Sequence, residues 1–284
     1  MSSKIIDGKA VSRQILDKVK SDIELLRSAH KRIPALAVIL VGNNPASQIY
    51  VRNKKKACHD VGIESIEYNL PENTTEKELL ELINQLNNSS TVDGILVQLP
   101  LPSHLNSKLV IDSINPNKDV DGFHRYNMGS LALNDASICP CTPHGIINLL
   151  DSINFTYVGK YAVIIGASNI VGRPMALELL NRGATVSICN SKTPNIKQFT
   201  NTADLIVVAI GKPKYLKKEF VKDGVVIIDV GINRLSDNTI CGDVDFDELV
   251  EVAKYITPVP GGVGPMTIAM LIKNTIACYN KPTN

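Results

Sequence analysis

Short apolar runs that alternate with amphipathic stretches are the feature that most restricts the fold of this sequence. The run ALAVILV at 35–41 is apolar throughout and predicts a buried strand. Apolar residues at helical spacing before it predict a long helix over 9–29. The expected elements that follow are a helix over 46–61, a strand near 63–68, a helix near 75–87 and a strand over 93–98. Such alternation predicts a parallel sheet within an α/β layer.

The same alternation resumes in the second half of the sequence. The expected elements there are strand 161–165, helix 170–181 and strands 184–189, 204–209 and 225–229. This run predicts a Rossmann-type domain over 145–261, the second of two α/β domains. The first domain is expected to span 1–144 and to be completed by a C-terminal helix within 262–284. Residues 98–145 are rich in Pro, Asp and Gly and are predicted to be exposed loops.

Composition restricts the class of protein further. The chain has 284 residues and a formal net charge of +2, so charge gives no reason to expect a nucleic acid or membrane partner. No apolar run is long enough to span a membrane. The six cysteines are scattered, and the spacing of Cys139 and Cys141 is not that of a zinc-ligand pair, so no metal site is predicted. A reducing, cytoplasmic compartment is expected.

The stretch VIIGASNIVGRPMALELL at 163–180 is a candidate cofactor loop. Gly166 follows an apolar strand, where a residue without a Cβ permits a tight turn. The next helix is expected to begin near Ile170, and its free N–H groups would favour a phosphate. Because only Gly166 and Gly172 are present, an ordinary strand-to-helix turn remains the alternative.

The end of the next strand bears on the choice of cofactor. In an NAD site an acidic side chain at this point binds the ribose 2′-hydroxyl. Here the strand ends in Asn190, Ser191 and Lys192, without an acid. A hydroxyl and a cation suit a 2′-phosphate, so NADP is the expected cofactor.

Three polar residues are expected to share one helical face in the first domain. Ser47, Tyr50 and Lys54 are spaced by three and four residues. Tyr-x-x-x-Lys is also the catalytic pair of short-chain dehydrogenases, but there it lies downstream of the nucleotide loop in the same domain. Here it lies far upstream of Gly166. The remaining alternative is a solvent-facing helix with an extended lysine.

Two further segments place polar groups near strand ends. Gln98 follows a predicted buried strand, at the sheet edge where α/β proteins bind ligands. The acids of KDVDGF either cap a turn or offer a carboxylate that accepts two hydrogen bonds, for example from the edge of a pterin.

Together these segments closely resemble the bifunctional methylenetetrahydrofolate dehydrogenase/methenyltetrahydrofolate cyclohydrolase (FolD) family. The resemblance covers essentially the whole length and is carried, in order, by PASQIYVRNKKKA, DGILVQLPLP, KDVDGF, PCTPHGI, GASNIVGRPM and TPVPGGVGPMT. It implies NADP-dependent oxidation of 5,10-methylenetetrahydrofolate, followed by hydrolysis to 10-formyltetrahydrofolate, in one-carbon metabolism. It also implies an active site in the cleft between the domains and a homodimer formed through the nucleotide domains.

The resemblance also implies roles for individual residues. Lys54 matches the catalytic lysine, Tyr50 the tyrosine that stacks on folate, and Asp121 the residue that holds the pterin. Ser47 and Gln98 match supporting groups near the lysine, and Pro258 and Gly262 lie in the loop that closes over folate. The matches to NADP-contacting positions are Gly166, Ala167, Ser168, Ser191 and Ile232.

One position departs from much of the family. Many members have Arg after the first glycine, where this chain has Ala167. That leaves Ser191 and Lys192 to bind the 2′-phosphate.

The oxidation and the hydrolysis make different demands on the protein. Folate nitrogens assist hydride loss, so the protein mainly orients the two reactants, whereas hydrolysis needs a proton carrier, a role that suits Lys54.

Two other functions fit the same two-domain plan. One is an NADP-dependent dehydrogenase of another small substrate, and the other is a nucleotide sensor without turnover. The set Tyr50, Lys54, Gln98 and Asp121 argues against a sensor.

Overall fold

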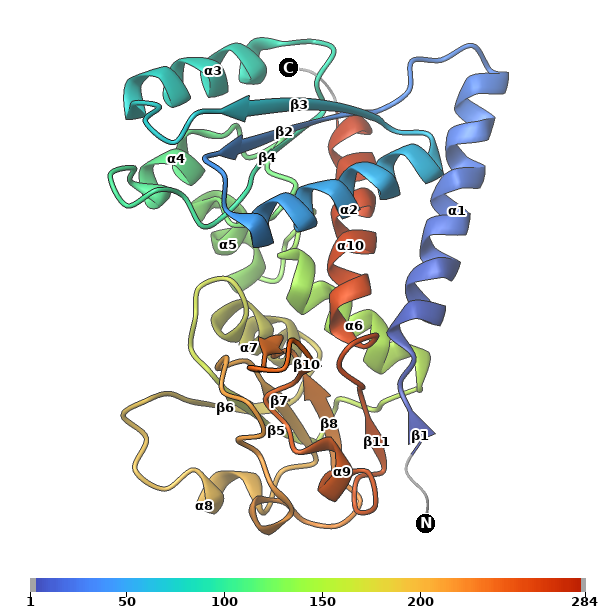
Figure 1. Cartoon of the computed structure of the whole chain (residues 1–284). Coiled ribbons are helices and arrows are strands. Elements are labelled where there is room, and N and C mark those ends of the chain that lie inside the picture. Colours follow the sequence, from blue (N-terminus) through green and yellow to red (C-terminus); the bar gives the residue numbers. More distant parts are fainter. Residues whose placement is uncertain (1–3, 282–284) are drawn as a thin grey trace. The chain divides into compact units, whose positions relative to one another are not determined.

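The computed structural model describes residues 4–281, which form two compact units. Unit 1 comprises residues 4–13 and 142–267, and unit 2 comprises residues 14–141 and 268–281. The elements of both units are labelled in Figure 1. Strand β1 (Lys4–Ile5) pairs in parallel with β11 (Tyr255–Ile256), so the start of the chain groups with the second half of the sequence. The expected division assigned these first residues to the other domain.

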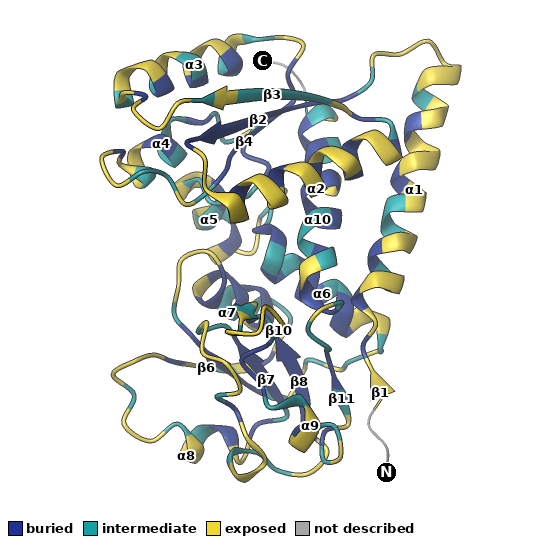
Figure 2. Cartoon of the chain, in the orientation of Figure 1, coloured by how far each residue is buried: buried dark blue, intermediate teal, exposed yellow. Residues whose placement is uncertain are grey.

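Unit 2 is built on a three-stranded parallel sheet in the order β3-β2-β4. All seven residues of the central strand β2 (Ala35–Val41) are buried, as Figure 2 shows in dark blue. The flanking strands are β3 (Glu64–Leu70) and β4 (Gly94–Val97). The chain leaves β2 for β3 on one side and returns to β4 on the other, so the carboxyl end of β2 is a topological switch point.

Local signals in the sequence set the helices of unit 2. The Asn44 side chain accepts hydrogen bonds from the backbone N–H groups of Ala46 and Ser47, and this caps α2 (Pro45–Val61). Gly62 ends that helix with φ of +87°, a conformation that suits glycine. The other long helices are α1 (Gly8–Ser28), α3 (Glu76–Asn88) and α10 (Val263–Tyr279). Each lies where the sequence predicts a helix.

The prediction that residues 98–145 form only exposed loops is wrong in part. The segment contains α4 (Ser107–Ser113), α5 (Arg125–Ala132) and the start of α6 (Cys141–Ser152). The side chains of Asn106 and His124 accept hydrogen bonds at the first turns of α4 and α5. These short helices are therefore stabilised by caps as well as by apolar faces.

Unit 1 is built on a six-stranded parallel sheet in the order β1-β11-β8-β7-β5-β6. Its strands in the Rossmann-type run are β5 (Tyr161–Ile165), β6 (Thr185–Cys189), β7 (Leu205–Val208) and β8 (Val226–Asp229). The chain leaves β5 for β6 on one side and returns to β7 on the other. The carboxyl end of β5 is therefore the switch point of this sheet, the place where such folds bind dinucleotides.

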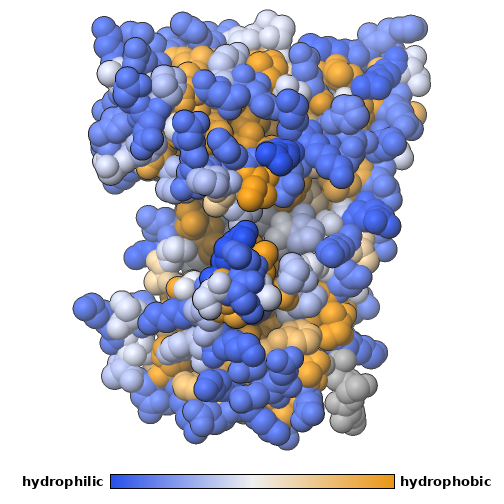
Figure 3. Space-filling model, in the orientation of Figure 1, coloured by the Kyte–Doolittle hydropathy of each residue, from blue (hydrophilic) through white to orange (hydrophobic). Residues whose placement is uncertain are grey.

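Shorter elements complete unit 1. They are α7 (Gly172–Asn181), α8 (Lys197–Thr200), a 3-10 turn (Lys218–Phe220), α9 (Phe246–Leu249) and the antiparallel pair β9 (Asn233–Arg234) and β10 (Ile240–Cys241). Among the described residues, no helix has both the length and the apolar character needed to cross a membrane. On the face drawn in Figure 3, hydrophilic side chains predominate and hydrophobic ones are scattered among them.

Candidate active site

A buried hydrogen bond joins the lysine and the glutamine that the sequence singled out in unit 2. Lys54 Nζ donates to Gln98 Oε1 over 3.0 Å, and both side chains are 8% exposed. Gln98 follows β4, and its Nε2 donates to the Leu99 carbonyl oxygen over 2.6 Å. Because its nitrogen is engaged there, its oxygen faces the lysine. Gln98 lies where the sequence predicts it, directly after a buried strand.

Ser47 and Tyr50, the other two polar residues predicted on the same face of α2 as Lys54, differ in how far they are exposed. Ser47 is 2% exposed and lies on the buried side of α2 with Lys54. Tyr50 lies between them in the sequence and is 43% exposed. An exposed aromatic ring beside a buried polar face is available to stack on a flat ligand.

The two acids of KDVDGF have separate roles. Asp119 is 2% exposed and accepts hydrogen bonds from the N–H groups of Gly122 and His124 and from Asn127 Nδ2. It therefore holds the turn, which is the role that the sequence left open for either acid. The Asp121 carboxyl receives no such bond among residues 4–281.

Asp121 remains free to bind a ligand. Burial raises its pKa to about 6, the Lys54 charge opposes that rise, and the Asp119 charge adds to it. A carboxyl with this pKa is largely ionised at pH 7 and has no protein donor in the described part of the chain. It is suited to accept hydrogen bonds from a substrate.

Asn274 of α10 supports this turn, and sequence reasoning missed it. Its Nδ2 donates to the carbonyl oxygens of Val120 over 2.8 Å and Cys139 over 2.9 Å. The side chain thereby joins the residue before Asp121 to the segment that contains Cys139. Asn274 is distant in sequence and stands in an apolar helix, so no local pattern indicates this contact.

The candidate cofactor loop follows β5 in unit 1. Gly166 has φ of +122°, and a Cβ added there would lie 2.2 Å from the Ala209 carbonyl oxygen. A Cβ added at Gly172 would lie 1.9 Å from the Gly166 carbonyl oxygen. Both glycines are therefore required by close backbone packing, and α7 begins at Gly172, two residues later than predicted.

Ser168 occupies this loop between the two glycines. Its hydroxyl accepts hydrogen bonds from the N–H groups of Val171, over 3.1 Å, and Gly172, over 3.5 Å. The neighbouring Ala167 is half-buried, whereas Ser168 is exposed. The loop is thus ordered by its own groups and leaves an exposed surface at the switch point.

The turn after β6 is also closed by its own residues. The Asn190 side chain accepts from the Lys192 N–H over 2.8 Å, and the Asn190 N–H donates to the Thr193 hydroxyl over 3.0 Å. Ser191 and Lys192 are exposed. Both side chains are available to an anion, and no carboxylate occurs in the turn.

Three further predicted residues lie in loops of unit 1. Ile232 is 51% exposed and follows β8. Gly262 is buried, and a Cβ added there would lie 2.6 Å from the Pro258 carbonyl oxygen. The loop that contains Pro258 and Gly262 therefore packs on itself, and the N–H of Lys9 donates to Gly261 within it.

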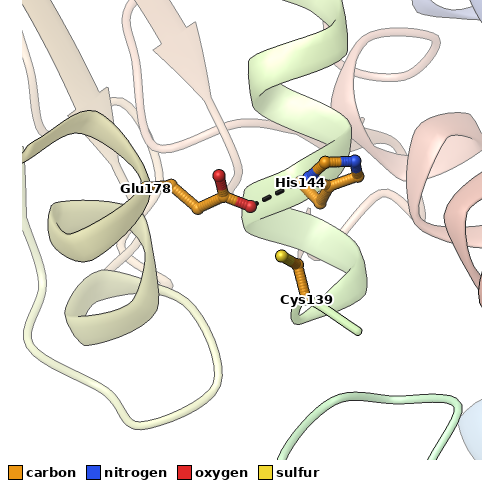
Figure 4. Close-up of side chains that lie close together, drawn as sticks. All are labelled: Cys139, His144 and Glu178. Atoms are coloured by element: carbon orange, nitrogen blue, oxygen red, sulfur yellow. Dashed lines mark hydrogen bonds and ion pairs between the residues drawn. The ribbon is translucent and has the colours of Figure 1, made fainter. Parts of the chain in front are cut away.

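The histidine of the motif PCTPHGI hydrogen-bonds to a buried carboxylate outside the motif. His144 of α6 and Glu178 of α7 point toward each other (Figure 4), with 2.9 Å between Nδ1 and Oε1. Glu178 is 2% exposed and also accepts from Arg182 over 2.6 Å. Because Arg182 and His144 both hydrogen-bond to this carboxylate, we assign His144 and Glu178 a structural role.

Comparison with known families identifies the chain. The model described as "Tetrahydrofolate dehydrogenase/cyclohydrolase, catalytic domain" matches residues 6–121. The model described as "Tetrahydrofolate dehydrogenase/cyclohydrolase, NAD(P)-binding domain" matches residues 140–283. The chain belongs to the tetrahydrofolate dehydrogenase/cyclohydrolase family.

Individual members of the family are similar over nearly the whole chain. The bifunctional protein FolD of Lachnoclostridium phytofermentans is 55% identical over 272 residues, which are 96% of each protein. The crystal structure of the bifunctional FolD enzyme of Campylobacter jejuni is 54% identical, with a TM-score of 0.96 over 98% of this chain and 99% of that one. The Trypanosoma brucei FolD structure, complexed with NADP cofactor and inhibitor, is 36% identical, with a TM-score of 0.94 over 98% of each chain.

The local geometry of unit 1 fits NADP, the cofactor in the Trypanosoma brucei structure. The two glycines remove the Cβ atoms that would block the backbone, as a dinucleotide turn requires. The exposed hydroxyl and ammonium of Ser191 and Lys192 suit a 2′-phosphate. The loop after β5 therefore has the close backbone packing of a dinucleotide turn, with two glycines in place of three.

Proposed function

We propose that Lys54, Gln98 and Asp121 form the folate-binding and cyclohydrolase centre of this family member, with Ser47 and Tyr50 as supporting groups. The enzyme oxidises 5,10-methylenetetrahydrofolate to 5,10-methenyltetrahydrofolate with NADP and then hydrolyses the product to 10-formyltetrahydrofolate. The observation that carries the residue assignment is the buried bond between Lys54 and Gln98. The same unit contains the Asp121 carboxyl, which has no donor among residues 4–281.

Hydrolysis requires a proton carrier, and Lys54 provides one. Water adds to the carbon of the methenyl cation, and a proton must then reach the ring nitrogen that departs. The bond to Gln98 holds the Lys54 nitrogen in one position and leaves its other hydrogen positions free. Lys54 delivers the proton from that fixed position, while the exposed Tyr50 ring stacks on the folate.

Asp121 orients the folate. An ionised carboxylate accepts two hydrogen bonds from the amidine-like edge of a pterin, and such charge-assisted pairs are stronger than neutral ones. Asp119 and Asn274 hold the backbone on either side of it. Pro258 and Gly262 belong to the loop that we assign to closure over the substrate.

The nucleotide domain binds NADP, which accepts the hydride when bound. We assign the contacts to Gly166, Ala167, Ser168 and Ile232, and we assign the 2′-phosphate to Ser191 and Lys192. We propose domain limits of 145–261 for this part, with 1–144 and 262–284 serving the folate. These limits follow function, whereas packing places residues 4–13 with unit 1.

We further propose that the enzyme is a homodimer formed through unit 1. Strand β6 is a free edge of the six-stranded sheet in the described structure. Ile188 on this strand is 41% exposed, and Leu180 near the end of α7 is 58% exposed. Exposed apolar side chains beside an open edge support association with a second copy.

We assign the enzyme to the cytoplasm. All six cysteines are free thiols, which suits a reducing compartment.

One assay tests the function. Purified protein is mixed with methylenetetrahydrofolate and NADP, and the absorbances of NADPH and methenyltetrahydrofolate are followed. We expect both to rise, and methenyltetrahydrofolate supplied alone to be hydrolysed. NADPH formation without hydrolysis would contradict the cyclohydrolase assignment, and binding of NADP without any turnover would indicate a sensor.

A further inference from the structure

Two buried aspartates of unit 1 have no part in the assignment above. Asp243 is 0% exposed and Asp229 is 3% exposed. Neither belongs to an ion pair with any residue in the described part of the chain. A buried carboxylate without a cation is costly, so its hydrogen-bond donors must offset the loss of water.

Asp243 receives four donors from two separate segments. Its Oδ2 accepts from the N–H groups of Ile210 over 2.7 Å and Gly211 over 2.9 Å. Its Oδ1 accepts from the N–H of Lys212 and from Asn233 Nδ2, both over 2.8 Å. The carboxylate thereby joins the loop after β7 to the β9–β10 pair.

Asp229, the last residue of β8, holds Asp243 itself. Its Oδ1 accepts from the N–H groups of Gly231 over 3.0 Å and Asp243 over 2.9 Å. Its Oδ2 accepts from the N–H of Val244 over 3.0 Å. The two carboxylates thus form one connected network.

Two glycines let the backbone approach these carboxylates. A Cβ added at Gly231 would lie 2.2 Å from Asp243 Oδ1, and one added at Gly242 would lie 1.7 Å from Asp229 Oδ2. Both distances are far below any normal contact. Positions 231 and 242 therefore require glycine for this network to form.

The network lies at the carboxyl ends of β7 and β8, in the same sheet as the candidate cofactor loop. The loop after β7 packs on the first glycine of the cofactor loop, since a Cβ at Gly166 would lie 3.4 Å from Ile210 Cγ2. Ile232 stands between Gly231 and Asn233, and the network holds both of these neighbours. The carboxylates therefore fix the backbone that follows β7 and the backbone that follows β8.

We propose that Asp243, supported by Asp229, is a positioning residue of the NADP site. It holds Ile210, Gly211 and Lys212 against the cofactor loop and holds Asn233 so that Ile232 keeps its exposed position. This proposal rests on the proposed function, because it assigns the nucleotide to this edge of the sheet. It adds two residues that touch neither cofactor nor folate.

The test compares NADP binding with a reaction that needs no NADP. In full-length Asp243→Asn an amide nitrogen replaces one accepting oxygen, so two N–H donors lose their acceptor while the shape is kept. We expect the Kd for NADP, measured by titration calorimetry, to rise about 10–100-fold, as when groups that orient a binding site are lost. Hydrolysis of supplied methenyltetrahydrofolate and the KM for methylenetetrahydrofolate should stay at the wild-type values.

A control and a milder variant accompany it. Asp247→Asn makes the same charge change on a side chain that is 86% exposed, and NADP binding should not change. Asn233→Ala removes one donor and keeps the carboxylate, so a smaller rise in the Kd is expected even if Asp243→Asn does not fold.

Other outcomes would overturn the proposal. Wild-type NADP affinity in both Asn233→Ala and a folded Asp243→Asn would exclude a positioning role. An equal loss of NADP binding and of hydrolysis would indicate a general structural role instead. If the wild-type protein binds NADP but acts on no folate, the proposed function fails, and the same titrations still decide the positioning role.

Discussion

Lys54 and Gln98 are 44 residues apart in the sequence, and a buried hydrogen bond of 3.0 Å joins them. The lysine comes from the helix that follows the central strand β2, and the glutamine comes from the end of the neighbouring strand β4. Two consecutive crossovers of a parallel sheet thus bring this lysine and its hydrogen-bond acceptor together.

Substitution of the lysine should separate the two reactions. Lys54→Met keeps the length of the side chain and removes the ammonium. Cyclohydrolase activity should fall about 10²–10⁴-fold, the usual loss for a positioned acid–base group. Dehydrogenase activity should fall much less, so methenyltetrahydrofolate should accumulate and its absorbance should persist.

Lys56→Met is the matched control, because Lys56 lies on the exposed side of the same helix. It should leave both rates unchanged. Hydrolysis at the wild-type rate in Lys54→Met would assign the proton to another group. An equal fall of both activities would assign Lys54 to substrate binding.

Folate binding should weaken in acid. Burial raises the pKa of Asp121 to about 6, so its carboxylate is present above this pH and becomes protonated as the pH falls through it. The KM for methylenetetrahydrofolate in the dehydrogenase reaction should therefore rise below pH 6, by up to about tenfold per pH unit.

The variant Asp121→Asn tests whether Asp121 is the group that causes this pH dependence. The variant should bind folate weakly at all pH values and lose the break near pH 6, and its affinity for NADP should remain. A break of the same size in the variant would mean that another group titrates.

The preference for NADP should depend on the turn after β6. Lys192→Ala removes an exposed cation whose neighbour is Ser191, and the KM for NADP should rise while that for NAD stays constant. The loss of one exposed charge–phosphate contact amounts to about 1 kcal/mol, or several-fold in KM. Equal use of both cofactors by the unmodified enzyme would refute the assignment.

A single methyl group at position 166 should prevent NADP binding. In Gly166→Ala the new Cβ would lie 2.2 Å from the Ala209 carbonyl oxygen, at φ of +122°. Calorimetric titration should detect little NADP binding, while hydrolysis of methenyltetrahydrofolate continues. Gly129→Ala in α5 is the control, because a Cβ there has no neighbour within 4 Å.

Strands β2 to β8 were predictable, whereas the two-residue strands and the helices of residues 98–145 were not. The apolar run of β2 is long enough to specify a buried strand by itself. In α6, by contrast, Pro143 and Gly145 suggest a turn. Proline is tolerated in the first helical turn, where its missing N–H has no partner. Gly145 is needed because a Cβ would lie 2.8 Å from the Met266 side chain, a contact that no local pattern indicates.

The same distinction applies to the sites. Helical spacing and strand ends indicate Lys54 and Gln98, because each is placed by its own element. Asp243 reaches a loop some thirty residues earlier in the chain, and Asn274 reaches two loops from the last helix. Such contacts depend on how distant segments pack, and a single sequence does not encode them in a readable pattern.

Strand β1 has a consequence for how this protein can be divided. Residues 4–13 belong to unit 1, and the chain passes between the units after residues 13, 141 and 267. A fragment of residues 142–267 would lack β1 and leave the edge of β11 without its partner, open to aggregation. Neither unit can therefore be produced from one continuous segment of the sequence. During synthesis, β1 has no partner strand until β11 has been made, so the sheet of unit 1 forms completely only when most of the chain is present.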